Sequence, residues 1–359
     1  MNILILIKDG HVGGLTNHVK LLATQLQKKK HKVIIGMTAG DSNSFFFEDL
    51  KVESFNFNSL NPLILLKNYI KMIKLINREG IQIIQSENRI TSLYAYIYCF
   101  FHKKIKFLWA NHMVPIPYGR LHKLITKVGK CAVASTIEGK RFLINKLDVS
   151  PKKVKVINLG IELQQFNRLP KNESIQLKVN NGFNEDDKIV LLYGRLTPEK
   201  GHMFLLDSIT KAELPDNVKF VFPGDNDEFK QEIITRARQL NIKNELVFPG
   251  LIIGTEWLNF IDLMVLPSKK EGFPLACLEA FAMGVPVIRT RTGGFEDTKQ
   301  YCSGVKFGDS RTLGLLMQQF FDGKGEFNEK ADNALNMISE FSADKMADKY
   351  IKLYEKILR

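Results

Sequence analysis

The sequence predicts an α/β protein built from two doubly wound domains, each a parallel sheet with helices on both faces. Three observations carry this prediction. Short apolar runs rich in β-branched residues alternate with segments of helical periodicity, which is typical of parallel βαβ units. This alternation stops once, in the polar segment 161–187, and then resumes. The chain has 359 residues, and a single core rarely grows beyond about 250–300 residues.

The first half is expected to contain six strands with helices between several of them. After the first strand, Leu15, Val19, Leu22 and Leu26 recur at helical spacing, which predicts a helix there. The strands are expected at residues 2–7, 32–37, 82–85, 106–110, 131–134 and 154–157.

The second half follows a segment that carries Pro170 and Gly182 but no sustained periodicity, so a linker is expected there. Domains of residues 1–165 and 166–341 are therefore predicted, followed by a last helix over 342–358. Parallel sheets bind ligands at the carboxyl ends of their strands, so a ligand cleft is expected between the two halves. The strands of the second half are expected at 188–193, 218–222, 245–248, 262–266 and 285–289.

Composition narrows the class of protein. A hydrophobic fraction of 45% and a charged fraction of 25% are typical of a globular protein and exclude a disordered or collagen-like chain. The longest uncharged apolar stretch, 91–101, is much shorter than the roughly 20 residues of a membrane helix, and no signal peptide is expected at the N-terminus. The four cysteines lack CxxC spacing, which favours reduced thiols over a zinc site. We therefore expect a cytoplasmic protein.

Positive charge is concentrated in the first half. Residues 1–160 hold 25 Lys and Arg against 9 Asp and Glu, whereas the remainder holds 26 against 29. Such a bias suits an anionic partner, namely nucleic acid, anionic lipid or an acidic polymer, although a solvated lysine-rich face explains it as well. Within this half, Pro62–Arg78 combines an apolar face with four cationic residues, as a helix on an anionic membrane or a core helix with a solvated face would.

The segment SKKEGFPLACLEAFAMGVPVIRTRTGG carries the strongest chemical signal. Pro274 suits the first turn of a helix, so the amides of Phe273 and Leu275 are expected at its N-terminus, where phosphate or sugar hydroxyls bind. Glu271 precedes this helix, and Glu279 lies about 8 Å further along its axis. The two carboxylates are too far apart to share a proton, but they can hold two parts of one hydroxyl-rich ligand. A solvated glutamate pair is the alternative.

The segment YGRLTPEKG is a second candidate site. Thr197 is a good N-cap and Pro198 suits the first helical position, so Arg195 and Lys200 would flank a helix start. Guanidinium, ammonium and free amides together suit a diphosphate. Surface cations beside a capped helix are the alternative.

Three further features are less specific. The glycine loop that ends at Gly14 lacks GxGxxG spacing, which excludes a dinucleotide site, but it admits either a ligand or a tight turn. His112 follows a strand and is either a general base or hydroxyl donor, or a structural residue. Asp225-Asn226-Asp227 resembles a metal-binding DxD, but Arg195 and Lys200 can neutralise a diphosphate without a metal, so we expect a turn and helix cap.

Together these segments resemble the retaining glycosyltransferases of family 4, which have the two-domain GT-B fold. EGFPLACLEAFAMGVPVI matches the family's E-x7-E motif, GRLTPEKG its diphosphate loop, GGLTNHV its N-terminal glycine loop and FPGDNDE its GDGP-like turn. VINLGIELQQF is similar to the interdomain segment. The resemblance covers nearly the whole chain and is densest over 188–298. The GDGP and NGVD patterns are altered to GDND and LGIE, which leaves the donor's identity open.

The resemblance implies a role for each matched residue. In the donor site, Glu271 would bind sugar hydroxyls, Glu279 the ribose, and Arg195 and Lys200 the diphosphate. Phe273, Pro274 and Leu275 would line the site, Leu251 would lie against the base, Gly14 by the diphosphate and His112 by the transferred sugar. Residues 342–359 would pack back on the N-terminal domain.

The expected function is transfer of a sugar, with retention, from a nucleoside-diphosphate sugar such as a UDP-sugar to a glycan or lipid-linked acceptor in cell-surface polysaccharide or glycolipid synthesis. No metal or other cofactor is expected. The basic half would meet the acceptor and the inner face of an anionic membrane. Alternatives are a nucleotide-sugar epimerase of the same fold, a non-catalytic partner subunit and a nucleic-acid-binding protein.

Overall fold

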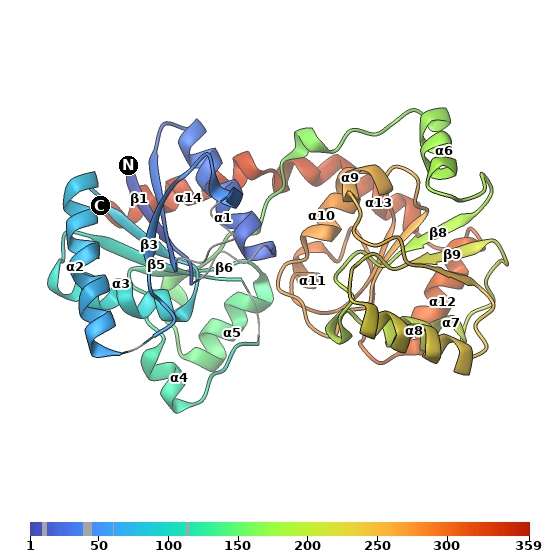
Figure 1. Cartoon of the computed structure of the whole chain (residues 1–359), viewed down its shortest axis with the longest axis horizontal. Helices are drawn as coiled ribbons and strands as arrows, with labels where there is room; N and C mark the ends of the chain where they lie inside the picture. Colours follow the sequence, from blue (N-terminus) through green and yellow to red (C-terminus); the bar gives the residue numbers. More distant parts are fainter. Residues whose placement is uncertain (9–12, 39–44, 60, 113–114) are drawn as a thin grey trace. The chain divides into compact units, whose positions relative to one another are not determined.

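The computed structural model describes residues 1–8, 13–38, 45–59, 61–112 and 115–359, and the fold is α/β as predicted (Figure 1). The chain divides into two compact units. Met1–Ile161 and Phe341–Arg359 form the first, and Glu162–Glu340 forms the second. This division falls four residues before the boundary expected at 165.

The first unit is a seven-stranded parallel sheet in the order β3-β2-β1-β4-β5-β6-β7. The order reverses between β1 and β4, and ligands of such sheets bind at the carboxyl ends of the strands beside that reversal. The strands are β1 (Asn2–Leu6), β2 (Lys32–Thr38), β3 (Lys51–Phe55), β4 (Ile83–Ser86), β5 (Lys106–Asn111), β6 (Cys131–Ala134) and β7 (Val154–Val156).

Helices from both ends of the chain cover this sheet. α14 (Ala343–Leu358) returns to the first unit and packs on α1 (Gly14–Lys28), with Met346, Tyr350 and Leu353 in the core that β1 and β2 also line. A parallel bridge between Ile161 and Ser342 joins the two points where the chain leaves and re-enters the unit. The remaining helices are α2 (Pro62–Glu79), α3 (Arg89–Phe101), α4 (Arg120–Ile125) and α5 (Ile137–Leu147).

An ion cluster at the end of α2 ties helix to sheet. The buried carboxylate of Glu79 accepts from Lys51 and Lys32 at 2.8 Å and from Arg78 at 2.6 Å. These hydrogen bonds, first that from Lys32 and then those from Lys51 and Arg78, lower the pKa of Glu79 to about 2. Glu79 therefore connects α2 to β2 and β3.

The second unit repeats the design with six strands in the order β10-β9-β8-β11-β12-β13. The strands are β8 (Lys188–Leu191), β9 (Val218–Val221), β10 (Glu245–Val247), β11 (Leu263–Leu266), β12 (Val287–Thr290) and β13 (Ser303–Val305). The helices are α6 (Lys171–Asn180), α7 (His202–Ile209), α8 (Asp227–Gln239), α9 (Gly254–Trp257), α10 (Leu275–Ala282), α11 (Phe295–Thr298), α12 (Ser310–Phe321) and α13 (Phe327–Met337).

The structure corrects the expected linker and adds two strands. The segment 161–187 contains α6, whose only buried residue is Lys178, so the helix leaves no apolar period in the sequence. β3 and β13 escape prediction because they are short and carry polar residues. In the described part of the chain, no helix is long and apolar enough to cross a membrane.

Candidate active site

The second unit brings together two residues predicted from separate motifs. Lys200 ends a short 3-10 helix, Pro198–Lys200, that follows β8, and Glu271 lies in the loop between β11 and α10. The Lys200 Nζ lies 2.7 Å from Glu271 Oε1, with both side chains largely buried. The Lys200 ammonium can bind a phosphate group of a ligand, and the adjacent Glu271 carboxylate can accept hydrogen bonds from its hydroxyls.

Gly201, which follows Lys200, lets the loop after β8 pack against the end of β11. Its φ of +81° lies in the left-handed region, and an added Cβ would lie 2.0 Å from the carbonyl oxygen of Pro267. Only glycine therefore lets the loop after β8 approach the end of β11 so closely. Thr197 occupies the cap position but makes no side-chain cap hydrogen bond, which corrects that part of the prediction.

Glu279 lies half-buried on α10. Burial raises its pKa to about 7, so near neutral pH its carboxyl exchanges between donor and acceptor forms. Tyr193, after β8, has its pKa raised to about 12 by burial and then by Glu279. The Tyr193 hydroxyl lies so close to Gly254 that a Cβ there would be 2.3 Å away. Tyr193 thus borders the first residue of α9 (Gly254–Trp257), and Glu279 lies near enough to Tyr193 to raise its pKa.

The first turn of α10 differs slightly from prediction. The helix begins at Leu275, and buried Pro274 is its N-cap without a side-chain hydrogen bond. Phe273 is also buried, whereas Leu275 is partly exposed. Amides in a first helical turn have no intrahelical acceptor, so the Leu275 amide keeps the predicted capacity to bind an anion or a hydroxyl.

The remaining residues of this unit that were predicted to bind the donor lie on its surface. Arg195 is exposed in the loop after β8, and Leu251 is 78% exposed.

Asn226 accepts from the Phe229 amide at 3.1 Å and caps α8, and it also donates to the Leu196 carbonyl at 3.0 Å. The turn-and-cap interpretation of 225–227 is confirmed.

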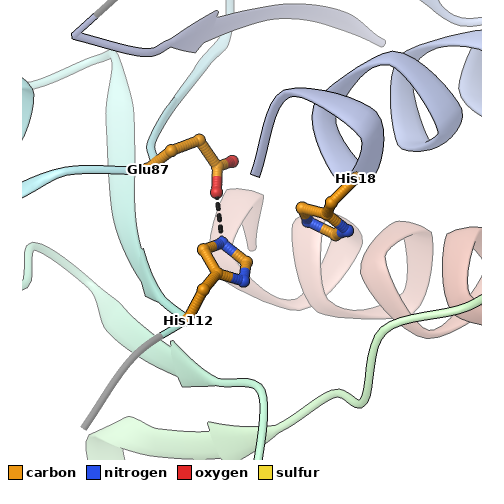
Figure 2. A group of neighbouring side chains, drawn as sticks. All are labelled: His18, Glu87 and His112. Carbon is orange, nitrogen blue, oxygen red and sulfur yellow. Dashed lines mark hydrogen bonds and ion pairs between the residues drawn. The ribbon is translucent and has the colours of Figure 1, made fainter. Parts of the chain in front are cut away.

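In the first unit, His112 lies in a buried cluster that the predictions did not include (Figure 2). His112 follows β5, Glu87 follows β4 and His18 lies on α1. The Nε2 of His112 is 2.6 Å from Oε2 of Glu87, and the His18 and His112 rings are 4.6 Å apart between centroids. Burial, and then His112, hold the pKa of His18 well below its usual range, so its ring is neutral.

The side chains of this cluster are of the kinds that bind metal cations. One ligand atom from each of His18, Glu87 and His112 lies within 4.8 Å of the others, and His and carboxylate are common metal ligands. His112 Nε2 and Glu87 Oε2 already share a short hydrogen bond. Glu87 had a signal in the sequence, because it follows a predicted strand just as His112 does, and their strands are neighbours in the sheet.

Gly14 is the first residue of α1, is exposed, and has open space where a Cβ would lie. The preceding Gly13 amide donates to Thr16 Oγ1 at 2.9 Å, which holds the helix start. Residues 10–12 of the predicted loop lie outside the described residues. Gly14 and His112 belong to the first unit, whereas the other predicted site residues belong to the second.

Comparisons with known proteins agree with this architecture. A family model described as Glycosyltransferase Family 4 matches residues 12–165, and one described as Glycosyl transferases group 1 matches residues 173–301. The chain superposes on the structure of HepE of Anabaena in complex with UDP with a TM-score of 0.88, at 18% identity, covering 99% of this chain and 100% of that one.

Two curated relatives are transferases with named acceptors. The UDP-Gal:α-D-GlcNAc-diphosphoundecaprenol α-1,3-galactosyltransferase of Escherichia coli is 27% identical over 250 residues, which cover 64% of this chain and 62% of that protein. The N,N'-diacetylbacillosaminyl-diphospho-undecaprenol α-1,3-N-acetylgalactosaminyltransferase of Campylobacter jejuni is 24% identical over 97% of this chain and 98% of its own length. The chain spans only about half the length of several other curated relatives that it matches. With both halves matched and the GT-B architecture in place, the chain belongs to the family 4 glycosyltransferases.

Proposed function

We propose that the chain transfers a sugar, with retention, from a nucleoside-diphosphate sugar to a hydroxyl of a lipid-linked or glycan acceptor in cell-surface glycan synthesis. The observation that carries the proposal is the Lys200–Glu271 pair beside the first turn of α10, with the ionisable Glu279 further along the same helix. A UDP-sugar is the proposed donor, supported by the UDP bound in HepE and the UDP-Gal donor of the E. coli relative.

Each residue of the second unit has a task in this proposal. Lys200 and Arg195 neutralise the diphosphate, and Glu271 accepts hydrogen bonds from hydroxyls of the transferred sugar. Glu279, when ionised, accepts from the ribose hydroxyls. As the bond between C1 and the phosphate oxygen breaks, its electron pair passes to the diphosphate, and the two cations stabilise the developing charge. Because the cations are part of the chain, the proposal requires no metal.

The acceptor hydroxyl attacks C1 from the face that the diphosphate leaves, and its proton passes to the departing phosphate oxygen. Double displacement would instead need a carboxylate nucleophile in the first unit. Glu87 is a poor nucleophile, because one of its oxygens pairs with His112 and the other accepts from Gln85. This occupancy supports same-face transfer.

Donor binding is tested by thermal unfolding with UDP-, GDP- and ADP-linked sugars, with and without EDTA. One donor should raise the Tm, EDTA should not change that shift, and Glu279→Ala should abolish it. Glu329→Ala, a change of an exposed glutamate on α13, should keep the shift. No shift with any donor would contradict the proposal and favour a non-catalytic partner subunit. Interconversion of donor isomers without acceptor would favour an epimerase.

We also propose that the first unit meets the membrane through α2 and α3. Leu63, Leu66 and Ile70 form an exposed apolar stripe on α2, opposite the buried Met72 and Leu75. Phe100 and Phe101 at the end of α3 are 60% and 67% exposed, and the Phe101 ring is 6.2 Å from that of Tyr69 on α2. A solvated lysine face alone does not explain these exposed apolar residues.

Lysines and a pocket with several polar lining residues accompany the apolar stripe. Lys67 and Lys74 are exposed on α2, and basic residues beside an apolar face favour an anionic bilayer. A pocket of about 700 Å³, lined by Thr38, Asn56 and Lys67 among others, lies at the carboxyl ends of β2 and β3. The polar head of a lipid-linked acceptor fits this pocket, with its tail along the stripe.

Co-sedimentation with vesicles tests the membrane proposal. Wild-type protein should sediment with phosphatidylglycerol-containing vesicles and less with neutral ones. Leu66→Asp should release it, whereas Leu315→Asp, at a similarly exposed leucine of α12, should not. Equal binding by both variants would refute this surface.

A further inference from the structure

A buried line of hydrogen bonds runs from the C-terminal helix to His112. The hydroxyl of Tyr354 on α14 donates to Oε1 of Gln85 at 2.5 Å. The Gln85 amide donates to Oε1 of Glu87 at 2.5 Å, and the other Glu87 oxygen lies 2.6 Å from His112 Nε2. Tyr354 and Gln85 are 0% exposed and Glu87 is 4% exposed, so water does not compete with these bonds.

The donor and the acceptor of each hydrogen bond in this line can be assigned. The amide nitrogen of Gln85 faces the carboxylate oxygen of Glu87, which accepts, and its amide oxygen faces Tyr354. Tyr354 must then donate, and it stays protonated because burial, followed by the nearby Glu87 and Cys131, holds its pKa well above its usual range. By the same rule, the His112 Nε2 facing Glu87 carries the hydrogen.

This line of hydrogen bonds therefore determines whether the other ring nitrogen of His112, Nδ1, carries a hydrogen. In the neutral ring, a hydrogen on Nε2 leaves Nδ1 as an acceptor. Nδ1 is buried, and among the described residues it has no hydrogen-bond partner. Among the described residues, the titratable side chain besides Glu87 that contacts the ring is His18 (Figure 2). The His18 ring itself lies 6.3 Å from that of Tyr350 between centroids.

We propose that Glu87, Gln85 and Tyr354 are positioning residues through which α14 sets the tautomer and orientation of the His112 ring. The functional consequence rests on the proposed function and on the role beside the transferred sugar that the family resemblance implies for His112. The line itself does not depend on that function. The hydrogen bond between Tyr354 and Gln85 joins residues 269 positions apart, so it connects α14 to the surroundings of His112.

The chain offers a matched control for this proposal. Tyr350 and Tyr354 lie one turn apart on α14, and both are 0% exposed. The Tyr354 hydroxyl belongs to the line, whereas the Tyr350 hydroxyl has no hydrogen-bond partner among the residues that the structure describes. Replacing each by phenylalanine removes the same atom from similar surroundings, so effects of packing alone should be alike in the two variants.

The experiment is 15N NMR of the full chain labelled at histidine, with the His112 signals assigned from a His112→Asn variant. Wild-type protein and Tyr350→Phe should show His112 with its hydrogen on Nε2 alone. Tyr354→Phe should shift the His112 signals toward a mixture of tautomers, and Glu87→Gln should do so more strongly, because an amide can also donate. Gln85→Met interrupts the line by a second route, should one of these variants fold poorly.

Turnover supplies the second readout. Tyr354→Phe should lower kcat about fivefold, the loss of roughly one hydrogen bond, while leaving the KM for donor unchanged. Tyr350→Phe should match wild type. Unchanged His112 signals in both Tyr354→Phe and Gln85→Met would overturn the proposal. So would stoichiometric Zn²⁺ binding that broadens the His18 and His112 signals together, since the cluster would then be a metal site. The NMR result needs no donor, so it stands apart from failure of the transferase proposal.

Discussion

Replacing Glu279 by glutamine should raise the free energy of unfolding at alkaline pH and leave it much less changed in acid. Burial raises the pKa of this carboxyl from 4.5 to about 7 in the folded protein, so folding favours its protonated form. The resulting stabilisation is complete only at pH values below 4.5, the pKa of the unfolded chain. It is lost as the pH rises through about 7, the pKa of the folded protein. The difference between the two pKa values corresponds to about 3 kcal/mol at pH 8. Glutamine resembles the neutral acid in shape and avoids this cost.

Urea unfolding at pH 4.5 and pH 8 measures the effect. Each unit has one buried tryptophan, Trp109 in the first and Trp257 in the second, so a Trp109→Phe background makes fluorescence report the second unit. Glu279→Gln should be more stable than its parent by about 3 kcal/mol at pH 8 and by under about 1 kcal/mol at pH 4.5. Glu329→Gln, at an exposed site, should show no such pH dependence. An equal effect of Glu279→Gln at both pH values would refute the reasoning.

Three further predictions follow from other sites. Lys200→Ala should lower kcat by about 100-fold or more, since it removes a cation from the leaving diphosphate, and near wild-type turnover would reject its role. Gly201→Ala should cost about 2 kcal/mol or more in urea unfolding, because its Cβ would clash with Pro267; Gly308→Ala, also at positive φ but with open space, should cost less. Glu79→Gln should remove stability that wild type holds above pH 4.5 and loses as the pH falls through about 2, so the two proteins should converge in acid unfolding; a constant gap would contradict this.

Much of the fold was predictable because its strands are buried on both faces. Ile3–Leu6 in β1 is wholly buried, and such a run is visible in the sequence without alternation. Elements that bury little were missed, as α6 was, because no apolar period marks them. The local structure of the candidate donor-site motif was likewise predictable, since Glu271, Pro274 and Glu279 all lie within one loop and helix.

The sequence by itself determined the elements that bury many apolar residues and the local motifs that follow them, because periodicity and glycine positions act over a few residues. Only the tertiary structure decided which motifs meet. It paired Lys200 with Glu271, 71 positions away, and connected His112 to Tyr354 through Gln85 and Glu87. The physical reason is that such partners depend on strand order and on the return of α14 to the first sheet. A hydrogen bond is specific to about 3 Å, whereas apolar periodicity constrains only which face of an element is buried.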